Sequence, residues 1–428
     1  MAVVTDPESS LADMSMCHSA ICLAMLAQLA SSTSPALAQG LAIGTPATTP
    51  APVHYMFPDL DADHKLLPEL NTRFLTSVVG IELVLDNTGF RQDSTSIAQV
   101  GEQGNLFEVR SASLEFTGNF GLQKRLRYKL GVEYKGFDVA PEKNWALTDF
   151  AVFLDFERAR LSLGKIRESF SYEVIGSTAS MPQSERVMGV FAAPRNAGII
   201  MQHVLGRQDQ MTLAYGLYKD DWGSGGGRVG ISARLTGLVV DRPDQREFLH
   251  IGASVRHAGT DDQIRYQAKP GTNAADAFVD TGIFPAAGAD HFGVELQYNS
   301  GPFSVGGEYA LARVRSTEAG NPHFSGFYVL GSWVITGESR PYDRSAGLFR
   351  KIVPQGRWGA PEIIARYSNV DLNDRLIMGG RYDRIDLGVN WWATTRWKLG
   401  ADWGRIWLDR FGARSRTDSL LARLQWVY

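Results

Sequence analysis

The chain has 428 residues, with 44 glycines, 11% aromatic residues and a formal net charge of -3. Apart from the N-terminal region it contains no run of roughly 20 apolar residues, which excludes a bundle of membrane-spanning helices. The glycines are spread through strand-like segments rather than collected in linkers. This distribution favours one large β-structure over several soluble domains.

Residues 1–38 have the features of a signal peptide. A short apolar core is followed by Ser, Thr and Pro and then by a small-x-small cleavage site at Ala36–Ala38. Residues 1–18 contain no Lys or Arg, although the start of a signal peptide is usually basic. Translation from Met14 or Met16 is therefore an alternative, as is a disordered N-terminus with a buried apolar patch.

Cleavage after residue 38 would leave a chain without thiols and without net charge. Both cysteines, Cys17 and Cys22, precede the cleavage site, which suits an oxidising envelope compartment. The removed segment holds three of the 46 acidic residues and none of the 43 basic ones, so net charge indicates no partner. Residues 39–70 are rich in Pro, Thr and Ala, and we expect a flexible leader there.

The segment 124–135 alternates between apolar and charged residues over about eleven positions. One parity is apolar and the other carries charges; the two sets are Leu126, Tyr128, Leu130, Val132 and Tyr134, and Arg125, Arg127, Lys129, Glu133 and Lys135. Side chains of a strand point alternately to opposite faces, so this ribbon has one apolar and one charged face. Its length suits a strand that crosses ~25 Å of hydrocarbon and lines water with its other face.

The same period of two recurs along the chain and predicts an antiparallel transmembrane β-barrel of about sixteen strands. We place the strands at 76–86, 106–118, 124–135, 146–157, 159–167, 196–206, 209–219, 228–240, 247–257, 290–299, 302–314, 325–337, 360–370, 380–392, 396–408 and 419–428. Alternation slips within 106–118 and 327–336, and we attribute both slips to β-bulges. The chain ends on Trp426 and Tyr428, which is typical of outer-membrane barrels.

The gaps between the predicted strands alternate between short turns and long loops. An even number of strands places both ends of the barrel domain, 71–428, on the side of the short turns. Long loops are predicted at 87–105, 168–195, 258–289 and 409–418. The gap at 338–359 is long although it falls on the short-turn side, so either one hairpin is miscounted or this turn is extended.

Several stretches resemble the phosphate-selective porin O and P family and together cover most of the chain from about residue 106. They are LSLGKIRESFSYEVIGSTASMPQSERV from Leu161, APRNAGI from Ala193, YVLGSWVITGESRPYDR from Tyr328, ARYSNVDLND from Ala365 and GGRYDRIDLGVNWWATTRWKLGADWGRI from Gly379. The resemblance implies a sixteen-stranded homotrimeric porin set in outer-membrane lipid and lipopolysaccharide. By their composition, residues 39–70 would be its periplasmic leader or a loose plug. The resemblance also implies that the third outer loop, here 168–195, folds inward as a constriction.

Clustered Arg and Lys side chains in a narrow pore favour anions, because they hold a partly desolvated phosphate by charge-assisted bonds. The pore-lining and anion-binding candidates lie on neighbouring strands and in the inward loop: Arg125, Arg127, Lys129, Arg158, Arg160, Arg186 and Arg195. The alternative is that lumen arginines pair with carboxylates and stiffen the wall. Glu173 and Glu185, in the same loop, would oppose an anion.

The sequence therefore predicts passive diffusion of small hydrophilic solutes, with a preference for anions such as phosphate or polyphosphate. The alternatives are a general porin without selectivity and an outer-membrane barrel enzyme such as a phospholipase. Against an enzyme, the candidate histidines of this chain are scattered, and no serine elbow lies near them: His203, His250, His257, His291 and His323. No catalysis, cofactor, metal or nucleic-acid partner is predicted, and Gly223–Gly227 lacks the Gly-Lys-Ser/Thr of a phosphate loop.

Overall fold

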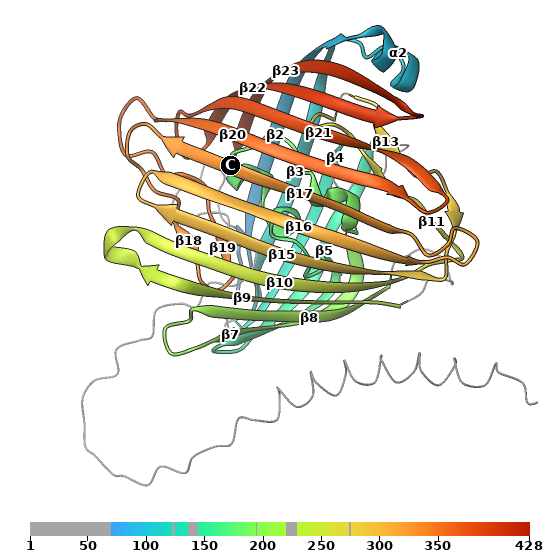
Figure 1. Cartoon of the computed structure of the whole chain (residues 1–428). Helices are drawn as coiled ribbons and strands as arrows, with labels where there is room; N and C mark the ends of the chain where they lie inside the picture. Colours follow the sequence, from blue (N-terminus) through green and yellow to red (C-terminus); the bar gives the residue numbers. More distant parts are fainter. Residues whose placement is uncertain (1–69, 122–124, 136–143, 194, 220–228, 274) are drawn as a thin grey trace, which may run out of the picture. The chain divides into compact units, whose positions relative to one another are not determined.

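A computed structural model of the protein describes residues 70–121, 125–135, 144–193, 195–219, 229–273 and 275–428. These residues form a closed antiparallel barrel of sixteen strands (Figure 1). The predicted signal peptide, 1–38, and residues 39–69 of the predicted leader lie outside this part of the chain. Within it, no helix has the length and apolar character needed to traverse a membrane.

All sixteen predicted strands are confirmed, with shifted ends. The barrel strands are β2 (Leu75–Gln92), β3 (Leu106–Phe120), β4 (Leu126–Tyr134), β5 (Trp145–Asp155), β6 (Ala159–Ile166), β7 (Asn196–Leu205), β8 (Met211–Lys219), β9 (Val229–Arg242), β10 (Glu247–Gly259), β15 (Gly288–Ser300), β16 (Phe303–Arg315), β17 (His323–Val334), β20 (Ala360–Asp374), β21 (Ile377–Trp392), β22 (Trp397–Arg410) and β23 (Ala413–Val427). Each strand pairs with its neighbour in the chain, and β23 pairs back onto β2, with Leu85 opposite Leu424. A short strand, β1 (Leu70–Asn71), precedes the barrel and pairs with β2.

The two faces of the strands see different surroundings. On β4, Leu126 and Leu130 are 39% and 37% exposed, whereas the lumen-facing Lys129 is 7% exposed. The same alternation holds on later strands, where Leu235 and Val294 lie on the outer surface. An apolar outer face and a polar inner face are the pattern of a barrel surrounded by lipid, since closure leaves no unpaired strand edge.

The two predicted β-bulges have different outcomes. Between β2 and β3 the register shifts at Val84 and Leu85, which leaves Arg110 without a partner in the ladder and confirms the first slip. The second prediction is wrong, because β17 pairs with both neighbours without a shift. Leu330 breaks the alternation for another reason: it faces the lumen, where it packs against the buried apolar cluster inside the barrel.

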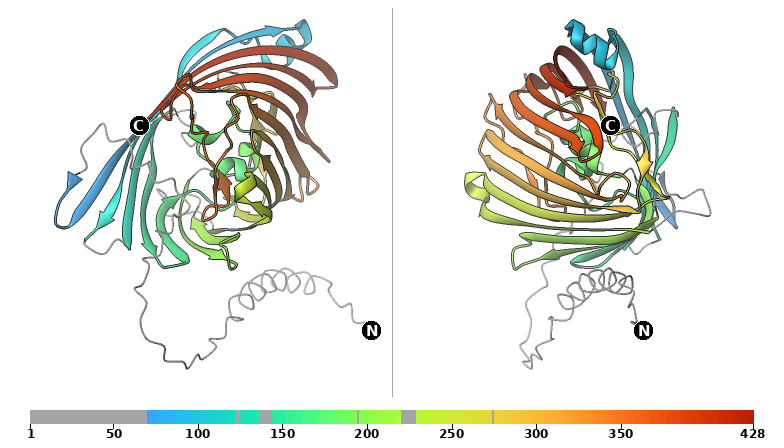
Figure 2. Two further views of the ribbon diagram at one scale, coloured as in Figure 1. Left: turned by 90° about the vertical axis from the view of Figure 1, so that its left-hand side faces the viewer. Right: turned by 45° about the vertical axis from the view of Figure 1, so that its right-hand side comes forward.

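The barrel has a turn end, which holds the short turns and the C-terminus, and a loop end opposite (Figure 2). The prediction of a long loop at 409–418 is wrong. Instead, β22 and β23 extend to a two-residue turn at Phe411 and Gly412, both with positive φ. The polar ends of these strands lie beyond the apolar stretch from which the strands were predicted. The predicted loop 87–105 is shorter, because β2 continues to Gln92 before α2 (Ser94–Val100).

Three connections fold into the lumen. The first is the inward loop, residues 167–195 between β6 and β7, which carries α3 (Tyr172–Ile175), η1 (Thr178–Ser180) and η2 (Met188–Phe191). The second joins β10 to β15 at the loop end and contains β11 (Gln263–Ile264), β12 (Gln267–Ala268), β13 (Val279–Asp280) and β14 (Phe284–Pro285). A 3-10 turn, η3 (Pro243–Gln245), joins β9 to β10 at the turn end.

The third inward connection is the inserted segment, residues 335–359 between β17 and β20, with β18 (Tyr342–Asp343) and β19 (Leu348–Phe349). This segment corresponds to the predicted gap 338–359 on the side of the short turns. No hairpin was miscounted there; the turn is extended, and the predicted number of strands is confirmed. Lumen-facing groups hold it inside the barrel: Gln202 of β7 donates to the Ser345 carbonyl, and Arg234 of β9 donates to the Gly347 carbonyl at 3.0 Å. The inserted segment therefore fills the lumen from the turn end.

Candidate functional site

The start of the inward loop is fixed by one carboxylate of the barrel wall. Glu308 on β16 accepts hydrogen bonds from the Ser171 hydroxyl at 2.7 Å and from the backbone N–H groups of Tyr172 and Glu173 at 2.8 and 2.7 Å. These N–H groups belong to the first turn of α3 and have no partner within the helix. Glu308 thus caps α3 and sets where the loop enters the lumen.

A second carboxylate, Glu173, closes the loop on itself. It is 1% exposed and accepts hydrogen bonds from the N–H groups of Val187 and Met188, both at 2.8 Å. It also accepts one from Arg366 of β20 at 2.6 Å. The Glu173 charge is therefore neutralised by the wall and shapes the loop.

The middle of the loop is tied to the wall through its backbone carbonyls. Each carbonyl acceptor receives a hydrogen bond from a side chain on β20 to β23 or on the inserted segment: Ser180 from Arg340, Met181 from Lys398, Pro182 from Asn390, Ser184 from Arg423 and Glu185 from Arg366. Five acceptors within six residues fix the path of the loop across the lumen. Many lumen cations are therefore used to position the loop.

Glu185 lies at the centre of a cluster of four charged groups in the constriction. Arg110 donates to its two oxygens at 2.6 and 2.9 Å, and Arg423 donates at 2.8 Å. Arg423 also binds Asp86 at 2.6 Å. Burial raises the pKa of Glu185, but the two guanidinium groups outweigh it and lower the pKa to about 2. The Glu185 carboxylate therefore stays ionised at any ordinary pH. The two guanidinium groups are balanced by the two carboxylates, Glu185 and Asp86.

The structure brings four of the seven sequence candidates together around two aspartates. Lys129 lies 2.9 Å from Glu115 and 3.3 Å from Asp149, and Arg195 donates to Asp149 at 3.0 Å. On the neighbouring part of the wall, Asp155 lies 2.5 Å from Arg160 and 3.7 Å from Arg127. Cations and carboxylates thus alternate along β4 to β7.

The other three candidates lie apart from these clusters. Arg125 is exposed at the turn end, where β4 begins, and Arg158 is exposed in the turn between β5 and β6, 2.5 Å from Asp209. Arg186 lies within the inward loop and donates to the carbonyls of Glu173 and Gly176 at 3.1 and 3.0 Å. Its hydrogen bonds brace the loop.

Lumen-facing side chains differ in burial around the barrel. On β2, β3 and β4, Glu82, Ser113, Glu115, Arg127 and Glu133 are only half-buried. On β7 to β10 and β16 to β23 nearly all lumen-facing positions of the described strands are buried beneath the three inward connections. We call these half-buried positions on the lumen face of β2, β3 and β4 the open wall.

Sequence reasoning missed Arg110 and Glu82. The β-bulge places Arg110 on the parity that elsewhere faces lipid, so a strict count of alternation assigns it to the wrong face. Glu82 lies on a strand that contributed no candidate, and only the burial pattern marks it as part of the open wall. Among the residues that the structure describes, no group of three His, Cys, Asp or Glu side chains is placed to hold a metal ion.

Comparison with known proteins agrees with this geometry. The family model for phosphate-selective porin O and P matches residues 83–428. An uncharacterized protein of Caulobacter vibrioides is 29% identical over 220 residues, which are 47% of this chain and 44% of that protein. Porin O of Pseudomonas aeruginosa is 26% identical over 152 residues, 32% of this chain and 35% of that porin. The matches thus span less than half the length of these curated relatives.

Solved structures share the fold at low sequence identity. OprB of Pseudomonas putida has a TM-score of 0.54 at 8% identity, over 83% of this chain and 94% of that one. The anion-selective porin of Comamonas acidovorans has a TM-score of 0.50 at 9% identity, over 83% of this chain and all of that one. The chain is an outer-membrane β-barrel porin and belongs to the phosphate-selective porin O and P family.

Proposed function

We propose that this porin passes small hydrophilic solutes across the outer membrane by passive diffusion and prefers anions such as phosphate. The preference is weaker than a row of unpaired arginines would give, because most basic groups of the constriction have carboxylate partners. The observation that supports the preference is a pair of guanidinium groups near Asp155, with Arg127 of β4 at 3.7 Å from it and Arg160 of β6 at 2.5 Å.

Arg127 is the member of this group that a solute can reach. Its side chain is 21% exposed, while that of Arg160 is 2% exposed and held by both oxygens of Asp155. A guanidinium that is partly exposed can present N–H groups to a passing anion. The buried Arg160 keeps Asp155 in place and offsets its charge.

A general porin without selectivity is the second candidate, and the charge balance at Glu185 favours it. The family and the fold indicate a channel rather than an enzyme. By likeness to an outer-membrane protein of Vibrio cholerae solved in a trimer form we also propose a homotrimer, with lipid and lipopolysaccharide against the apolar outer face. Residues 1–38 would direct export, and the leader that follows them would lie in the periplasm up to β1.

Reversal potential across a KCl gradient in planar bilayers tests the proposal. We expect an anion preference and a decrease of chloride conductance when millimolar phosphate is added. The Arg127→Ala variant should lose part of the preference, whereas Arg158→Ala should keep it, since Arg158 lies at the turn end paired with Asp209. Cation preference in the unmodified porin would leave only the general porin, and turnover of labelled phospholipid would favour the enzyme.

A further inference from the structure

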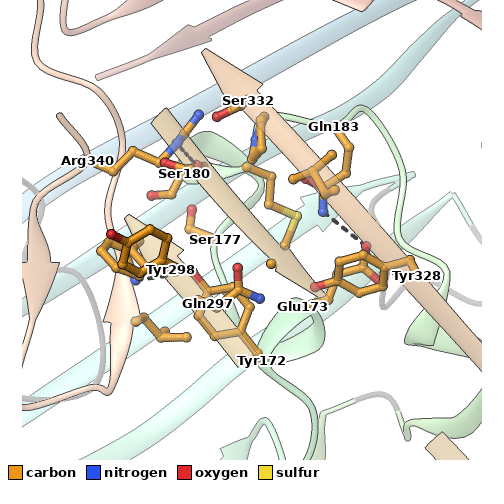
Figure 3. Close-up of a pocket in the computed structure, with 18 residues that line it drawn as sticks. Tyr172, Glu173, Ser177, Ser180, Gln183, Gln297, Tyr298, Tyr328, Ser332 and Arg340 are labelled. Carbon is orange, nitrogen blue, oxygen red and sulfur yellow. Dashed lines mark hydrogen bonds between the residues drawn. The ribbon is translucent and has the colours of Figure 1, made fainter. Parts of the chain in front are cut away.

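Between the inward loop and the inserted segment the lumen has no room for a second ligand. The cavity that separates these two segments measures about 60 Å³, which holds a few water molecules. Side chains of its lining bond to one another, as Gln183 does to Glu173 at 3.0 Å (Figure 3). The outer face of the barrel, in contrast, carries a group of exposed basic side chains at the loop end.

Three arginines surround one carboxylate on the outer face of β22, β23 and β2. Asp418 of β23 lies opposite Arg405 of β22 and opposite Arg91 of β2 in the two ladders. Arg416 lies two residues from Asp418 on β23, hence on the same face and about 7 Å along the strand. Thr417, which lies between them, is buried on the inner face, where α2 packs. The outer face of this group is therefore left uncovered by the barrel.

Only one of the three guanidinium groups is used in an ion pair. Arg405 donates to both oxygens of Asp418, at 2.7 and 3.0 Å. Within the described part of the chain, the side chains of Arg91 and Arg416 have neither an ion pair nor a hydrogen bond, and both are exposed. Asp93, which follows β2, accepts from the backbone N–H of Arg416 and from the first turn of α2. Three cations thus face two carboxylates, which leaves an excess of one positive charge.

Tryptophans indicate the depth of this group in the membrane. Trp403 and Trp407 flank Arg405 on the outer face of β22, and the Arg405 guanidinium lies 5.3 Å from the centre of the Trp403 ring. Aromatic girdles of such barrels lie at the two membrane interfaces, and the longer loops are extracellular. On the membrane side of Asp418, β23 presents Leu420, which is 60% exposed. The arginines therefore lie level with the headgroups of the outer leaflet, and Leu420 lies level with its acyl chains.

A phosphate monoester on a lipid matches this arrangement. Such a group carries about −1.5 to −2 charges at pH 7 and three strong acceptor oxygens. The donors of Arg91 and Arg416 are free to hold it by charge-assisted, bidentate hydrogen bonds. A phosphodiester headgroup carries a single negative charge, so two guanidinium groups hold it less tightly.

We propose that Arg91 and Arg416 bind a phosphate monoester of lipid A, the membrane anchor of lipopolysaccharide, in the outer leaflet. Arg405 adds positive charge beside the phosphate, and the acyl chains of the lipid pack against the apolar face around Leu420. The proposal gives the lipopolysaccharide partner proposed above one specific site on the barrel. It rests on the outer-membrane location of the barrel and is independent of the ion preference of the pore.

Native mass spectrometry of the detergent-solubilised full chain tests the site with three lipids: lipid A with both phosphates, lipid A with both phosphates removed, and phosphatidylglycerol. We expect the phosphorylated lipid A to bind most tightly. The double variant Arg91→Gln/Arg416→Gln should weaken its binding by roughly tenfold, and each single variant by about threefold, because charge-assisted bonds are lost. Both side chains are exposed and unpaired among the described residues, so these variants should fold.

A matched control lies on β16, beyond β17, β20 and β21. Arg313 and Arg315 are exposed at the same end of the barrel, so Arg313→Gln/Arg315→Gln removes the same charge elsewhere. It should leave lipid A binding unchanged, millimolar sodium phosphate should not displace the lipid, and both double variants should keep the reversal potential of the unmodified porin.

Several results would overturn the proposal. They are binding of dephosphorylated lipid A or phosphatidylglycerol as tight as that of phosphorylated lipid A, equal weakening by the control, and displacement of the lipid by sodium phosphate, which would indicate a site for free phosphate. A shifted reversal potential in Arg91→Gln/Arg416→Gln would place these arginines at the pore and would also overturn it. Cation preference in the unmodified porin would bear only on the diffusion function.

Discussion

Replacing Glu185 by Gln should increase the anion preference of the pore. The substitution keeps the size of the side chain and an oxygen that accepts from Arg110 and Arg423, so we expect the inward loop to stay in place. It removes one negative charge from a cluster in which two guanidinium groups now balance Glu185 and Asp86. The constriction then gains one net positive charge.

The size of the effect follows from Coulomb's law. In water, one charge at about 7 Å changes the energy of a monovalent ion by about 0.6 kcal/mol. The change favours anions and opposes cations, so without screening the permeability ratio shifts about sevenfold. Screening at 0.1 M salt, where the Debye length is about 10 Å, reduces the shift to about threefold.

The measurement is the reversal potential of the Glu185→Gln variant in a KCl gradient, at two ionic strengths. The control is Glu318→Gln, which makes the same charge change on an exposed loop between β16 and β17. We expect a shift toward anions for Glu185→Gln that shrinks with salt and little shift for the control. An unchanged reversal potential in Glu185→Gln would refute the position of this cluster at the pore.

Four further predictions concern the loop and the barrel. The pKa of Glu185 is lowered from 4.5 to about 2, so its hydrogen bonds should hold the inward loop fully above about pH 4.5 and weaken as the pH falls toward 2. Protease sensitivity of the loop at each pH measures this, and the Glu185→Gln variant should show no such pH dependence. Phe191→Ala removes a ring of the inward loop that is 1% exposed, at a cost of about 3–5 kcal/mol, and should speed cleavage of the loop while the barrel stays folded on gels. Gly164→Ala should lower the unfolding temperature of the barrel, because Gly164 has a φ of 128° and an added Cβ would meet the Phe150 carbonyl; that φ alone costs about 1–3 kcal/mol. Leu235→Arg places a charge on the outer face and should cost about 2–4 kcal/mol in liposome refolding, and no loss would mean that this face does not see lipid.

Local patterns were sufficient to predict the barrel itself. Alternation in 124–135 requires only that neighbouring side chains point to opposite faces, and this is a property of the strand alone. The same pattern located all sixteen strands and assigned most of the lumen charges to the correct face. It erred where contact inside the lumen replaces water, as at Leu330, and where strands extend beyond the membrane, as at 409–418.

The contents of the lumen were decided by tertiary structure. Glu173 meets Arg366 across 193 positions of sequence, and Arg423 meets Asp86 across 337. No local period carries such pairings, because the first depends on where the inward loop crosses the barrel and the second on the closure of β23 against β2. The sequence alone therefore determined which side chains enter the lumen, through alternation along each strand. Only the closed barrel decided which of those charges neutralise one another, since long-range contacts arise when distant strands and loops are brought together.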